Sequence, residues 1–267
     1  MSVLPSGLID LHCHILHRLD DGPSTIYESL QMARQFVRCG YSLVAATPHM
    51  VPGTILMPSS ILIKKKVAFL NQTLQTESPG FQIVPGMEIA LDPQIPELLD
   101  EGRLLAIGSS SYLLIESPFQ QLPPGWEHVF FSIMAKGYSI LLAHPERCQQ
   151  LINAPKLFDR LIESGVYMQA NWGSFFGQYG RAVARAAHHL AAKGYIHCLA
   201  SDSHNSSTQN PAVIEKETAK LRNMVGLGNL ERIARDNPLK VIHNQDLQPM
   251  KFEKHIKDKK VKKWRFW

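Results

Sequence analysis

Several common signals are missing from this chain of 267 residues. It contains no run of eighteen apolar residues, so the sequence predicts no membrane-spanning helix. The first residues lack a basic segment followed by an apolar one, so we expect no secretory signal. The motif Gly-x-x-x-x-Gly-Lys is also missing, which argues against a P-loop NTPase.

Cysteine is scarce, and its spacing excludes several kinds of site. The four cysteines are Cys13, Cys39, Cys148 and Cys198. They form no Cys-x-x-Cys pair, so neither a zinc knuckle nor a disulfide framework is predicted. None of them begins a Cys-x5-Arg loop, so a cysteine-nucleophile phosphatase is not indicated either. A reducing, cytoplasmic location is therefore the expectation.

Net charge is almost absent outside the C-terminus. Residues 251–267 carry eight of the 28 Lys and Arg and two of the 23 Asp and Glu, which leaves 20 basic and 21 acidic residues elsewhere. A nearly neutral body argues against nucleic-acid binding. We predict a domain at 1–248 and a basic tail at 249–267 that ends in Trp264, Phe266 and Trp267. Such a tail favours weak contact with an anionic membrane surface; a solvated end, or docking on the body or on a neighbouring subunit, are the alternatives.

Short apolar runs alternate with helical patterns over the first 200 residues. The seven predicted strands are 8–12, 43–47, 82–84, 112–115, 140–143, 166–170 and 196–200. The clearest helical patterns are 29–39, 126–135, 155–164 and 181–192. Near-continuous apolar strands that alternate with helices indicate a parallel sheet covered on both faces. We therefore predict an α/β fold with a seven-stranded, distorted TIM-like β/α barrel, and an open doubly wound sheet is the alternative.

Polar side chains that bind metals follow strand after strand. They are His12 and His14, His49, Glu88, Glu116, His144, and Asp202 with His204; Asp20 and Asp21 follow in the first loop. Alternation along a strand places His12 and His14 on one face and turns Cys13 to the other. Because active sites of β/α barrels lie at the carboxyl ends of the strands, we expect all these groups at one rim. A lone His is more often a core residue, but recurrence at successive strands favours ligands.

The donor types indicate which ions and which chemistry to expect. A mixture of imidazole and carboxylate favours Mn²⁺, Fe or Zn²⁺ over a pure Mg²⁺ site. Five His and four acids exceed what one ion requires. A carboxylate can bridge two ions about 3.5–4 Å apart, the spacing used for in-line phosphoryl displacement. The sequence therefore predicts a metal-dependent phosphoesterase.

The same residues lie in a series of longer motifs. These are Ile9-Asp10-Leu11-His12-Cys13-His14, Asp20-Asp21-Gly22-Pro23, Ala46-Thr47-Pro48-His49, Pro85-Gly86-Met87-Glu88-Ile89, Leu113-Leu114-Ile115-Glu116-Ser117-Pro118-Phe119, Ala143-His144-Pro145-Glu146-Arg147 and Ala200-Ser201-Asp202-Ser203-His204-Asn205. In this order they resemble the PHP (polymerase and histidinol phosphatase) superfamily. The Asp-Asp-Gly-Pro and His-Pro-Glu-Arg elements resemble its manganese-dependent tyrosine-protein phosphatases of bacterial capsule and exopolysaccharide operons.

The resemblance implies a PHP-type barrel that holds two to three divalent ions, expected to be Mn²⁺, with Fe, Zn²⁺ or Mg²⁺ as alternatives. The implied ligands are His12, His14, Glu88 and Asp202 for one ion; Glu88, Glu116 and His144 for a second; and Asp21, His49 and His204 for a third. Arg147 is expected to contact the substrate phosphate, for which its planar fork is suited. Asp202 is also a candidate general acid. Gln209 stands where the family usually has an arginine, so a second phosphate-binding charge is missing there.

The implied function is hydrolysis of phosphotyrosine on a protein, expected to be a membrane-anchored bacterial tyrosine kinase of polysaccharide export. One alternative is a small-molecule phosphatase, for example for histidinol phosphate, on the same site. The other is a non-catalytic, metal-binding regulatory protein, although such proteins usually lose ligands. The oligomeric state is not decided by the sequence.

Overall fold

The computed structural model describes residues 7–207 and 211–251, and no side chains of residues 211–217 are included. The strands are β1 (Leu8–Cys13), β2 (Tyr41–Ala46), β3 (His49–Met50), β4 (Gln82–Pro85), β5 (Glu88–Ala90), β6 (Tyr112–Glu116), β7 (Ser139–Ala143), β8 (Tyr167–Asn171) and β9 (Ile196–Ala200). The α-helices are α1 (Ile26–Arg38), α2 (Ser60–Leu74), α3 (Ile95–Asp100), α4 (Trp126–Ala135), α5 (Gln149–Asn153), α6 (Lys156–Glu163), α7 (Arg181–Lys193), α8 (Pro211–Val225), α9 (Leu227–Glu231) and α10 (Asn237–Ile242). Three shorter turns of helix are η1 (Pro145–Arg147), η2 (Trp172–Phe176) and η3 (Arg232–Asp236). Gln209 and most of the predicted tail lie outside the described residues.

Local sequence explains where several helices begin and end. The Thr25 side chain accepts a hydrogen bond from the Glu28 amide at 3.2 Å, and the Glu28 carboxylate accepts one from the Thr25 amide at 3.2 Å, which forms a capping box at the start of α1. The Ser59 side chain caps α2 by accepting from the Leu62 amide at 3.2 Å. At the end of α7, Gly194 has a φ of +76°, a conformation that glycine adopts without strain.

All seven predicted strands are present, but two of them are interrupted. Thr47 and Pro48 separate β2 from β3, and Gly86 and Met87, which follow Pro85 at the end of β4, separate β4 from β5. Proline has no amide hydrogen to donate to a neighbouring strand, so it ends regular pairing. The breaks are bridged by the Gly86 amide, which donates to the Ala46 carbonyl at 2.9 Å, and by the Glu88 amide, which donates to Pro48 at 3.1 Å. The two interruptions raise the strand count from seven to nine.

The strands pair in parallel and form two sheets. Their orders are β1-β2-β4 and β3-β5-β6-β7-β8-β9. One parallel bridge, between Cys13 and Ser203, brings the end of β1 beside the segment that follows β9. The prediction of an α/β fold with parallel strands is confirmed, whereas the predicted seven-stranded barrel, closed or nearly closed, is not: the strands form sheets of three and six. Regular strand pairing stops after Ala46 and after Pro85, and the strands divide there into two sheets.

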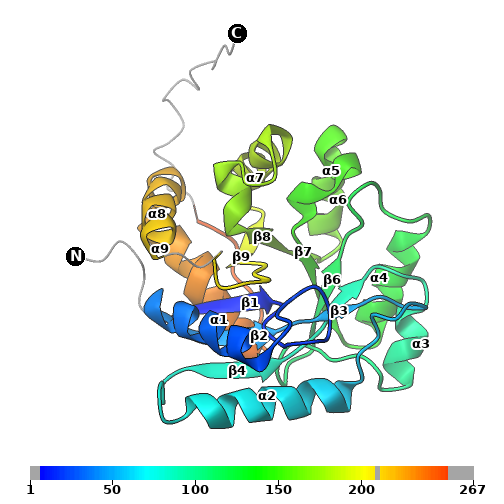
Figure 1. Ribbon diagram of the computed structural model, residues 1–267. Coiled ribbons are helices and arrows are strands. Elements are labelled where there is room, and N and C mark those ends of the chain that lie inside the picture. The colour runs from blue at the N-terminus through cyan, green and yellow to red at the C-terminus, as the bar shows by residue number, and fades with distance from the viewer. Residues whose placement is uncertain (1–6, 208–210, 252–267) are drawn as a thin grey trace.

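The helices form an outer layer around the strands (Figure 1). A large apolar cluster fills the space between strands and helices, and a smaller inner cluster lies between the strands themselves. The inner cluster consists of Ile9, Leu11, Leu43, Ala45, Val84, Ile107, Tyr112, Leu114, Leu141, Ala143, Cys198, Val241 and Leu247. Most of its members occupy alternate positions of their strands, as the period of two requires.

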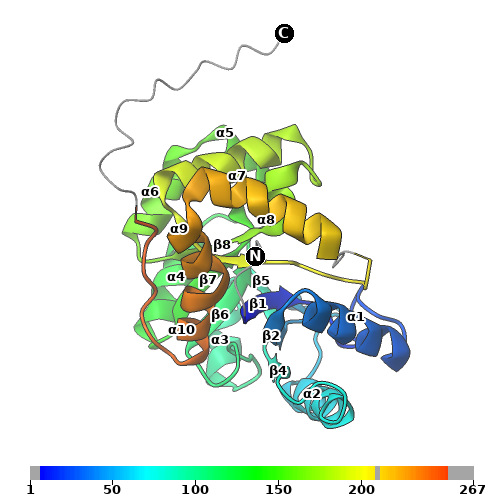
Figure 2. The same cartoon turned by 90° about the vertical axis from the view of Figure 1, so that its left-hand side faces the viewer.

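The amino ends of the strands are covered by the chain that follows α10. The Tyr112 hydroxyl donates to the Gln245 carbonyl at 2.8 Å, and the Ser111 amide donates to the Asn244 side chain at 2.8 Å. Figure 2 shows α8, α9 and α10 along the same side of the molecule. Because one end of the inner cluster is closed in this way, the polar side chains that face inward gather at the opposite end, where the strands finish.

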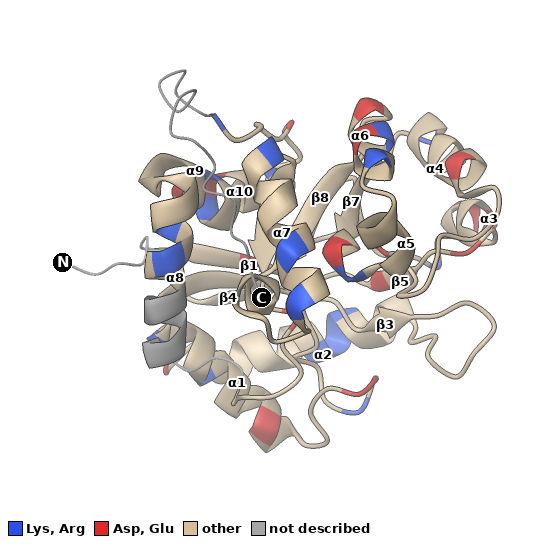
Figure 3. Cartoon of the chain, turned by 90° about the horizontal axis from the view of Figure 1, so that it is seen from above, with Lys and Arg blue, Asp and Glu red and all other residues tan. Residues whose placement is uncertain are grey.

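Charge and hydrophobicity of the surface agree with the sequence analysis where the structure describes it. Figure 3 shows basic segments on α7 and α8 and acidic segments on α1 and α3, so no side of this view carries one sign of charge alone. Within residues 7–207 and 211–251, no helix combines the length and apolar character needed to cross a membrane.

Asn237, the first residue of α10, holds the C-terminal segment on the body. Its buried side chain donates to the carbonyls of His197 at 2.8 Å and Gln248 at 2.7 Å, and it accepts from the Gln248 amide at 3.0 Å. Met250, two residues after Gln248, is buried. The packed body therefore continues slightly past the boundary at 248 that the sequence predicted.

Replacing Asn237 tests this anchor. Asn237→Ala removes three hydrogen bonds and leaves the buried His197 carbonyl without this partner, so we expect the free energy of unfolding to fall by about 1–3 kcal/mol in urea titration. The control is Asn153→Ala on the exposed end of α5, which we expect to change stability by less than about 0.5 kcal/mol. Equal stability of the two variants would show that the C-terminal segment is not held by Asn237.

Candidate metal centre

The inner face of the strands continues into the site. Leu114 of β6 belongs to the inner cluster, and two residues further along the strand Glu116 points the same way. On β9 the alternation runs from Cys198 through Ala200 to Asp202. Gln169 and Asn171 occupy the equivalent positions of β8. Regular alternation is therefore enough to bring most of the polar side chains to the rim above the inner cluster.

His12 and His14 reach the same rim because β1 is irregular. Ile9 and Leu11 face the inner cluster, so strict alternation would turn His12 away from it. The pairing of β1 with β2 shifts register between Asp10 and Cys13, which reverses the facing of the residues that follow. The buried Asp10 carboxylate holds this irregularity, since it accepts hydrogen bonds from the His12 amide at 2.9 Å and the Ser201 amide at 3.0 Å.

Two further candidate ligands have left-handed backbone conformations. His144 has a φ of +30° and Asp202 a φ of +53°. Such conformations cost about 1–3 kcal/mol for residues with a side chain, and they persist where the surroundings enforce them. The Asp202 amide donates to the His12 carbonyl at 3.0 Å, and this bond fixes Asp202 beside β1. The side chains of both residues point into the site from these strained backbone conformations.

The carboxylate of Glu88 lies at the centre of the site. It is 1% exposed, and four imidazole rings surround it. One oxygen, Oε1, lies 3.0 Å from Nε2 of both His12 and His144. The other, Oε2, lies 2.9 Å from Nδ1 of His49 and 3.3 Å from Nε2 of His14. Both oxygens therefore face nitrogen atoms of four histidines that come from three strands, β1, β3 and β7.

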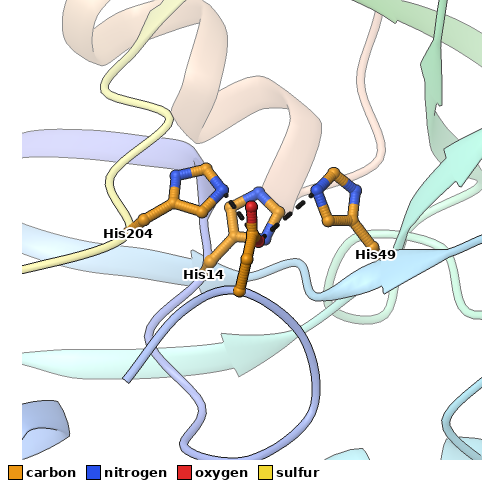
Figure 4. Close-up of side chains that lie close together, drawn as sticks. His14, His49 and His204 are labelled. Atoms are coloured by element: carbon orange, nitrogen blue, oxygen red, sulfur yellow. Dashed lines mark ion pairs between the residues drawn. The ribbon is translucent and has the colours of Figure 1, made fainter. Parts of the chain in front are cut away.

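The remaining candidates lie around this carboxylate. Asp202 Oδ1 lies 3.5 Å from Nε2 of His12, and Glu116 Oε1 lies 3.8 Å from Nε2 of His144. On the outer side, Nε2 of His204 lies 3.2 Å from the Asp21 carboxylate. Figure 4 shows the rings of His14, His49 and His204 gathered in this part of the site.

All nine metal ligands predicted from the sequence fall into groups whose donor atoms lie within 4.8 Å of one another. The groups are His12, His14 and Asp202; His12, Glu88 and His144; His49, Glu88 and Glu116; and His14, Asp21, His49 and His204. Glu88 belongs to two of them, as a bridging ligand must. The structure thus brings the predicted residues together, and their assignment to individual ions stays a prediction.

The electrostatics of the site favour added positive charge. Burial alone would raise the pKa of Glu88, but the charge and hydrogen bonds of the neighbouring His12 outweigh burial and hold the pKa well below its ordinary value. Burial alone would lower the pKa of His12, but the charges of Glu88 and Asp202 raise it to about 9. The pKa of Glu116 is raised, first by burial and then by the charge of Glu88. The same negative charge that holds protons on the imidazoles would attract divalent cations, which must displace those protons.

The donor atoms also fit metal binding in their orientation. Oε2 of Glu88 is buried and makes no well-aligned hydrogen bond among the described residues, although two imidazole nitrogens lie within 3.3 Å of it. Buried polar atoms are normally paired, so an oxygen in this position requires another partner. Imidazole nitrogen and carboxylate oxygen together are the ligands of Mn²⁺, Fe and Zn²⁺ sites. The residues present therefore fit a cluster of such ions.

A second layer of polar residues fixes the rings, and the sequence analysis assigned no role to it. Nδ1 of His14 lies 2.7 Å from Oδ2 of Asp20, which leaves Nε2 to face Glu88. The same Asp20 oxygen accepts from the His49 amide at 3.0 Å. Asp20 therefore orients one ring and positions the backbone of a second candidate ligand, the task that outer residues perform around protein metals.

β8 contributes no candidate metal ligand; it contributes the amide side chains of Gln169 and Asn171. Oε1 of Gln169 lies 2.9 Å from Nδ1 of His12, and its amide nitrogen donates to Oδ1 of Asn171 at 2.7 Å. Asn171 in turn donates to Oδ2 of Asp202 at 2.8 Å. A single chain of hydrogen bonds thus connects two candidate ligands. Polar residues at alternate positions of an otherwise apolar strand were the signal that could have revealed them.

Arg147 lies beside the candidate ligands, at the end of η1. Its Nη1 donates to Oδ2 of Asp202 at 2.7 Å, and its side chain is 21% exposed. No other hydrogen bond of its guanidinium occurs among the residues that the structure describes. The sequence predicted that Arg147 contacts a substrate phosphate, and its place at the edge of the centre agrees with that role.

The fold and this site define a class: α/β proteins that hold a cluster of divalent cations at the carboxyl ends of parallel strands. Within that class, the chain belongs to the family described as "Capsular polysaccharide synthesis, CpsB/CapC", whose profile matches residues 8–243. The resemblance to the tyrosine phosphatases of capsule operons, predicted from the motifs, is confirmed by this match.

Individual relatives agree with the family assignment. The chain is 33% identical over 253 residues to the tyrosine-protein phosphatase YwqE of Bacillus subtilis, covering 92% of this chain and 98% of that protein. It is 26% identical to the tyrosine-protein phosphatase CpsB of Streptococcus pneumoniae, covering 89% and 99%. A crystal structure from work on YwqE and CpsB, which are described there as metal-dependent tyrosine phosphatases, superposes with a TM-score of 0.81 at 30% identity, covering 92% of this chain and all of that one.

Gln169 offers a test of the second layer that leaves every candidate ligand in place. Gln169→Ala removes the partner of His12 Nδ1, so we expect Mn²⁺ affinity to fall about 10–100-fold in titrations against a competing chelator. Gln72→Ala, on the exposed surface of α2, is the matched control and should keep wild-type affinity. Unchanged affinity of Gln169→Ala would contradict an orienting role.

Proposed function

We propose that this protein is a metal-dependent protein-tyrosine phosphatase. The observation that carries the proposal is the Glu88 carboxylate at the junction of two candidate ligand groups, in a chain of the CpsB/CapC family. Several relatives are named tyrosine-protein phosphatases, which supports phosphotyrosine as the substrate. Their connection with capsular polysaccharide supports a phosphorylated, membrane-anchored tyrosine kinase as the natural partner.

We further propose the ligand assignment implied by the motifs. His12, His14, Glu88 and Asp202 would hold one ion; Glu88, Glu116 and His144 a second; and Asp21, His49 and His204 a third. The groups of neighbouring donors support this division in part. His12, His14 and Asp202 lie together, and so do Asp21, His49 and His204, with His14 added. Glu88 lies with His12 and His144 in one group and with His49 and Glu116 in another, so Glu116 and His144 fall in different groups. Mn²⁺ is the ion we expect, since the mixed nitrogen and oxygen donors suit it.

When bound, the cations supply a water nucleophile of lowered pKa and neutralise charge on the phosphate. Binding of the phosphate and departure of the phenol would depend on side chains of the protein. The free edge of the Arg147 guanidinium, beyond its bond to Asp202, would donate to phosphate oxygens and stabilise the charge that the transition state carries there. The leaving phenol has an ordinary pKa of about 10, so its departure needs little help from an acid.

Asp202 suits a ligand better than the general acid that the sequence also allowed. Its Oδ2 already accepts hydrogen bonds from Arg147 at 2.7 Å and Asn171 at 2.8 Å. Both donors stabilise the ionised carboxylate, which then has no proton to give to the leaving group. We therefore propose that Asp202 acts by holding metal, and that Arg147 is the residue that contacts the substrate.

Other parts of the sequence analysis remain predictions. We propose that residues 1–248 form the catalytic domain, and the family match to 8–243 supports this extent. The membrane contact of the tail concerns residues outside the described ones, as does the effect of Gln209. The cytoplasmic location and the oligomeric state are not tested by the geometry. A histidinol-phosphate type of activity stays as the alternative function.

The function is tested with the purified full-length chain. With Mn²⁺ added, we expect hydrolysis of a phosphotyrosine peptide at a kcat/KM at least about tenfold above that for histidinol phosphate, because the substrate class follows the family. Removal of metal by a chelator should abolish the activity, and Mn²⁺ should restore it. A preference for histidinol phosphate would support the alternative, and no hydrolysis of either compound would support a non-catalytic protein.

A variant pair connects that activity with the centre. Glu88→Gln keeps the size of the side chain but removes the charge shared by two candidate ion sites, so bound metal should fall below about one ion per chain and activity should disappear. Glu97→Gln on the exposed surface of α3 is the matched control. Retained metal and activity in Glu88→Gln would contradict the proposed bridging role.

Arg147 is tested separately, because it touches both a candidate ligand and the space for substrate. Arg147→Ala should lower kcat/KM for a phosphotyrosine peptide by about 10–100-fold, the loss of one charged hydrogen bond. At saturating Mn²⁺ the metal content should stay at the wild-type value. If metal content falls in parallel with activity, Arg147 acts by orienting Asp202 and not by binding phosphate.

A further inference from the structure

The guanidinium of Arg147 lies between two aromatic rings. Its Cζ atom is 4.5 Å from the centre of the Phe119 ring and 4.2 Å from the centre of the Tyr179 ring. Both distances are those of cation–π contacts, which restrict the guanidinium, and its N–H groups point outward along the edge of its plane. Asp202 takes one position of that edge. A phosphate bound to the rest of the edge must therefore lie next to the rims of both rings.

Phe119 is fixed to the turn that carries Arg147. Its carbonyl accepts a hydrogen bond from the Gln149 amide at 2.7 Å, and the Gln120 carbonyl accepts one from the Gln150 amide at 3.0 Å. Gln149 is only two residues after Arg147, so the loop between β6 and α4 and the turn at η1 form one unit. The Phe119 ring is therefore held in place before any substrate arrives, which reduces the entropy lost on binding.

The two rings differ in what they expose. Tyr179 is partly buried between η2 and α7, whereas Phe119 is 48% exposed. The centre of the Phe119 ring also lies 5.9 Å from the centre of the His144 ring, a candidate metal ligand. Phe119 thus presents a free aromatic surface at the border of the metal centre, and Tyr179 mainly supports the arginine from the other side.

The position of Phe119 determines which ester group it would meet. A phosphate held by the cations and Arg147 has the buried Glu88 behind it, so its ester substituent must leave toward the rim. In phosphotyrosine that substituent is an aromatic ring, which can stack on Phe119 with the usual separation of about 4.5–7 Å between ring centres. In phosphoserine it is a short methylene group, which places no ring there.

We propose that Phe119 forms an aryl subsite that gives this centre its preference for aromatic over aliphatic phosphate esters. The inference rests on the proposed phosphatase function and names the residue that would select its substrate class. A purely structural Phe119, which only covers Arg147, would affect all phosphate esters equally. An aryl subsite affects aromatic esters alone, so selectivity separates the two roles.

The experiment compares phosphotyrosine and phosphoserine in peptides of otherwise identical sequence. Phe119→Leu keeps an apolar side chain but removes the ring, so the ratio of the two kcat/KM values should fall about three- to tenfold. Phe119→Trp restores an aromatic face and should restore most of the ratio. Phe131→Leu changes a phenylalanine on α4 that is 67% exposed, and it should leave the ratio unchanged. Metal content is measured for each variant and should not change.

A binding measurement separates this proposal from the proposed activity. Phenylphosphonate and methylphosphonate are not hydrolysed, and their affinities for the Mn²⁺-loaded protein can be compared by calorimetry. We expect wild type to prefer phenylphosphonate and Phe119→Leu to lose most of that preference. If this pattern appears in a protein that hydrolyses no phosphotyrosine, the aryl subsite stands and the phosphatase function falls. If wild type shows no phenyl preference, or Phe119→Leu keeps it in both experiments, the aryl subsite is wrong even where the phosphatase is active.

Discussion

The buried carboxylate of Glu88 is the constraint around which the rest of the site is arranged. An isolated carboxylate at 1% exposure would be very unfavourable, and four imidazole rings from three strands converge on it. Two of those rings are in turn held by second partners: Asp20 lies at Nδ1 of His14 and Gln169 at Nδ1 of His12. The negative charge of the carboxylates is compensated only when positive charge lies among these groups. Divalent cations supply this charge more effectively than protons because one cation binds several donors at once.

The backbone is least regular where the site requires it. β1 shifts register beside Asp10, and His144 and Asp202 adopt left-handed conformations that other residues with side chains avoid. The register shift of β1 and the conformation of His144 turn side chains that regular alternation would direct elsewhere. The strain is sustained by bonds across the structure, such as the Asp202 amide to the His12 carbonyl and the Ser201 amide to Asp10. At these positions the regular backbone conformation is interrupted, and the donor atoms are held in place before any ion binds.

The two tasks of the proposed enzyme are divided between different parts of the fold. Apart from Asp21 in the first loop, the candidate metal ligands stand at or beside the ends of strands, and most of them are buried. The side chains that would meet the substrate, Arg147, Phe119 and Tyr179, lie on turns and loops above them. Such a division lets selectivity change through the loops while the metal centre stays intact. It also places the residues for phosphate and for the ester group within one stacked unit.

The sequence by itself determined the alternation of strands and helices, the nine candidate ligands and the family, because apolar periodicity and the residues at strand ends are local properties of the chain. It indicated that His12 and His14 share a face, but not that a register shift turns that face toward Glu88. It predicted seven strands in a closed or nearly closed barrel, and the structure has nine strands in two sheets, because regular pairing stops at Thr47-Pro48 and after Pro85. Only the tertiary structure decided the roles of Gln169 and Asn171 and the stacking of Phe119, Arg147 and Tyr179. These depend on contacts between residues far apart in the chain, and the spacing of residues along a sequence carries no record of which distant side chains will meet.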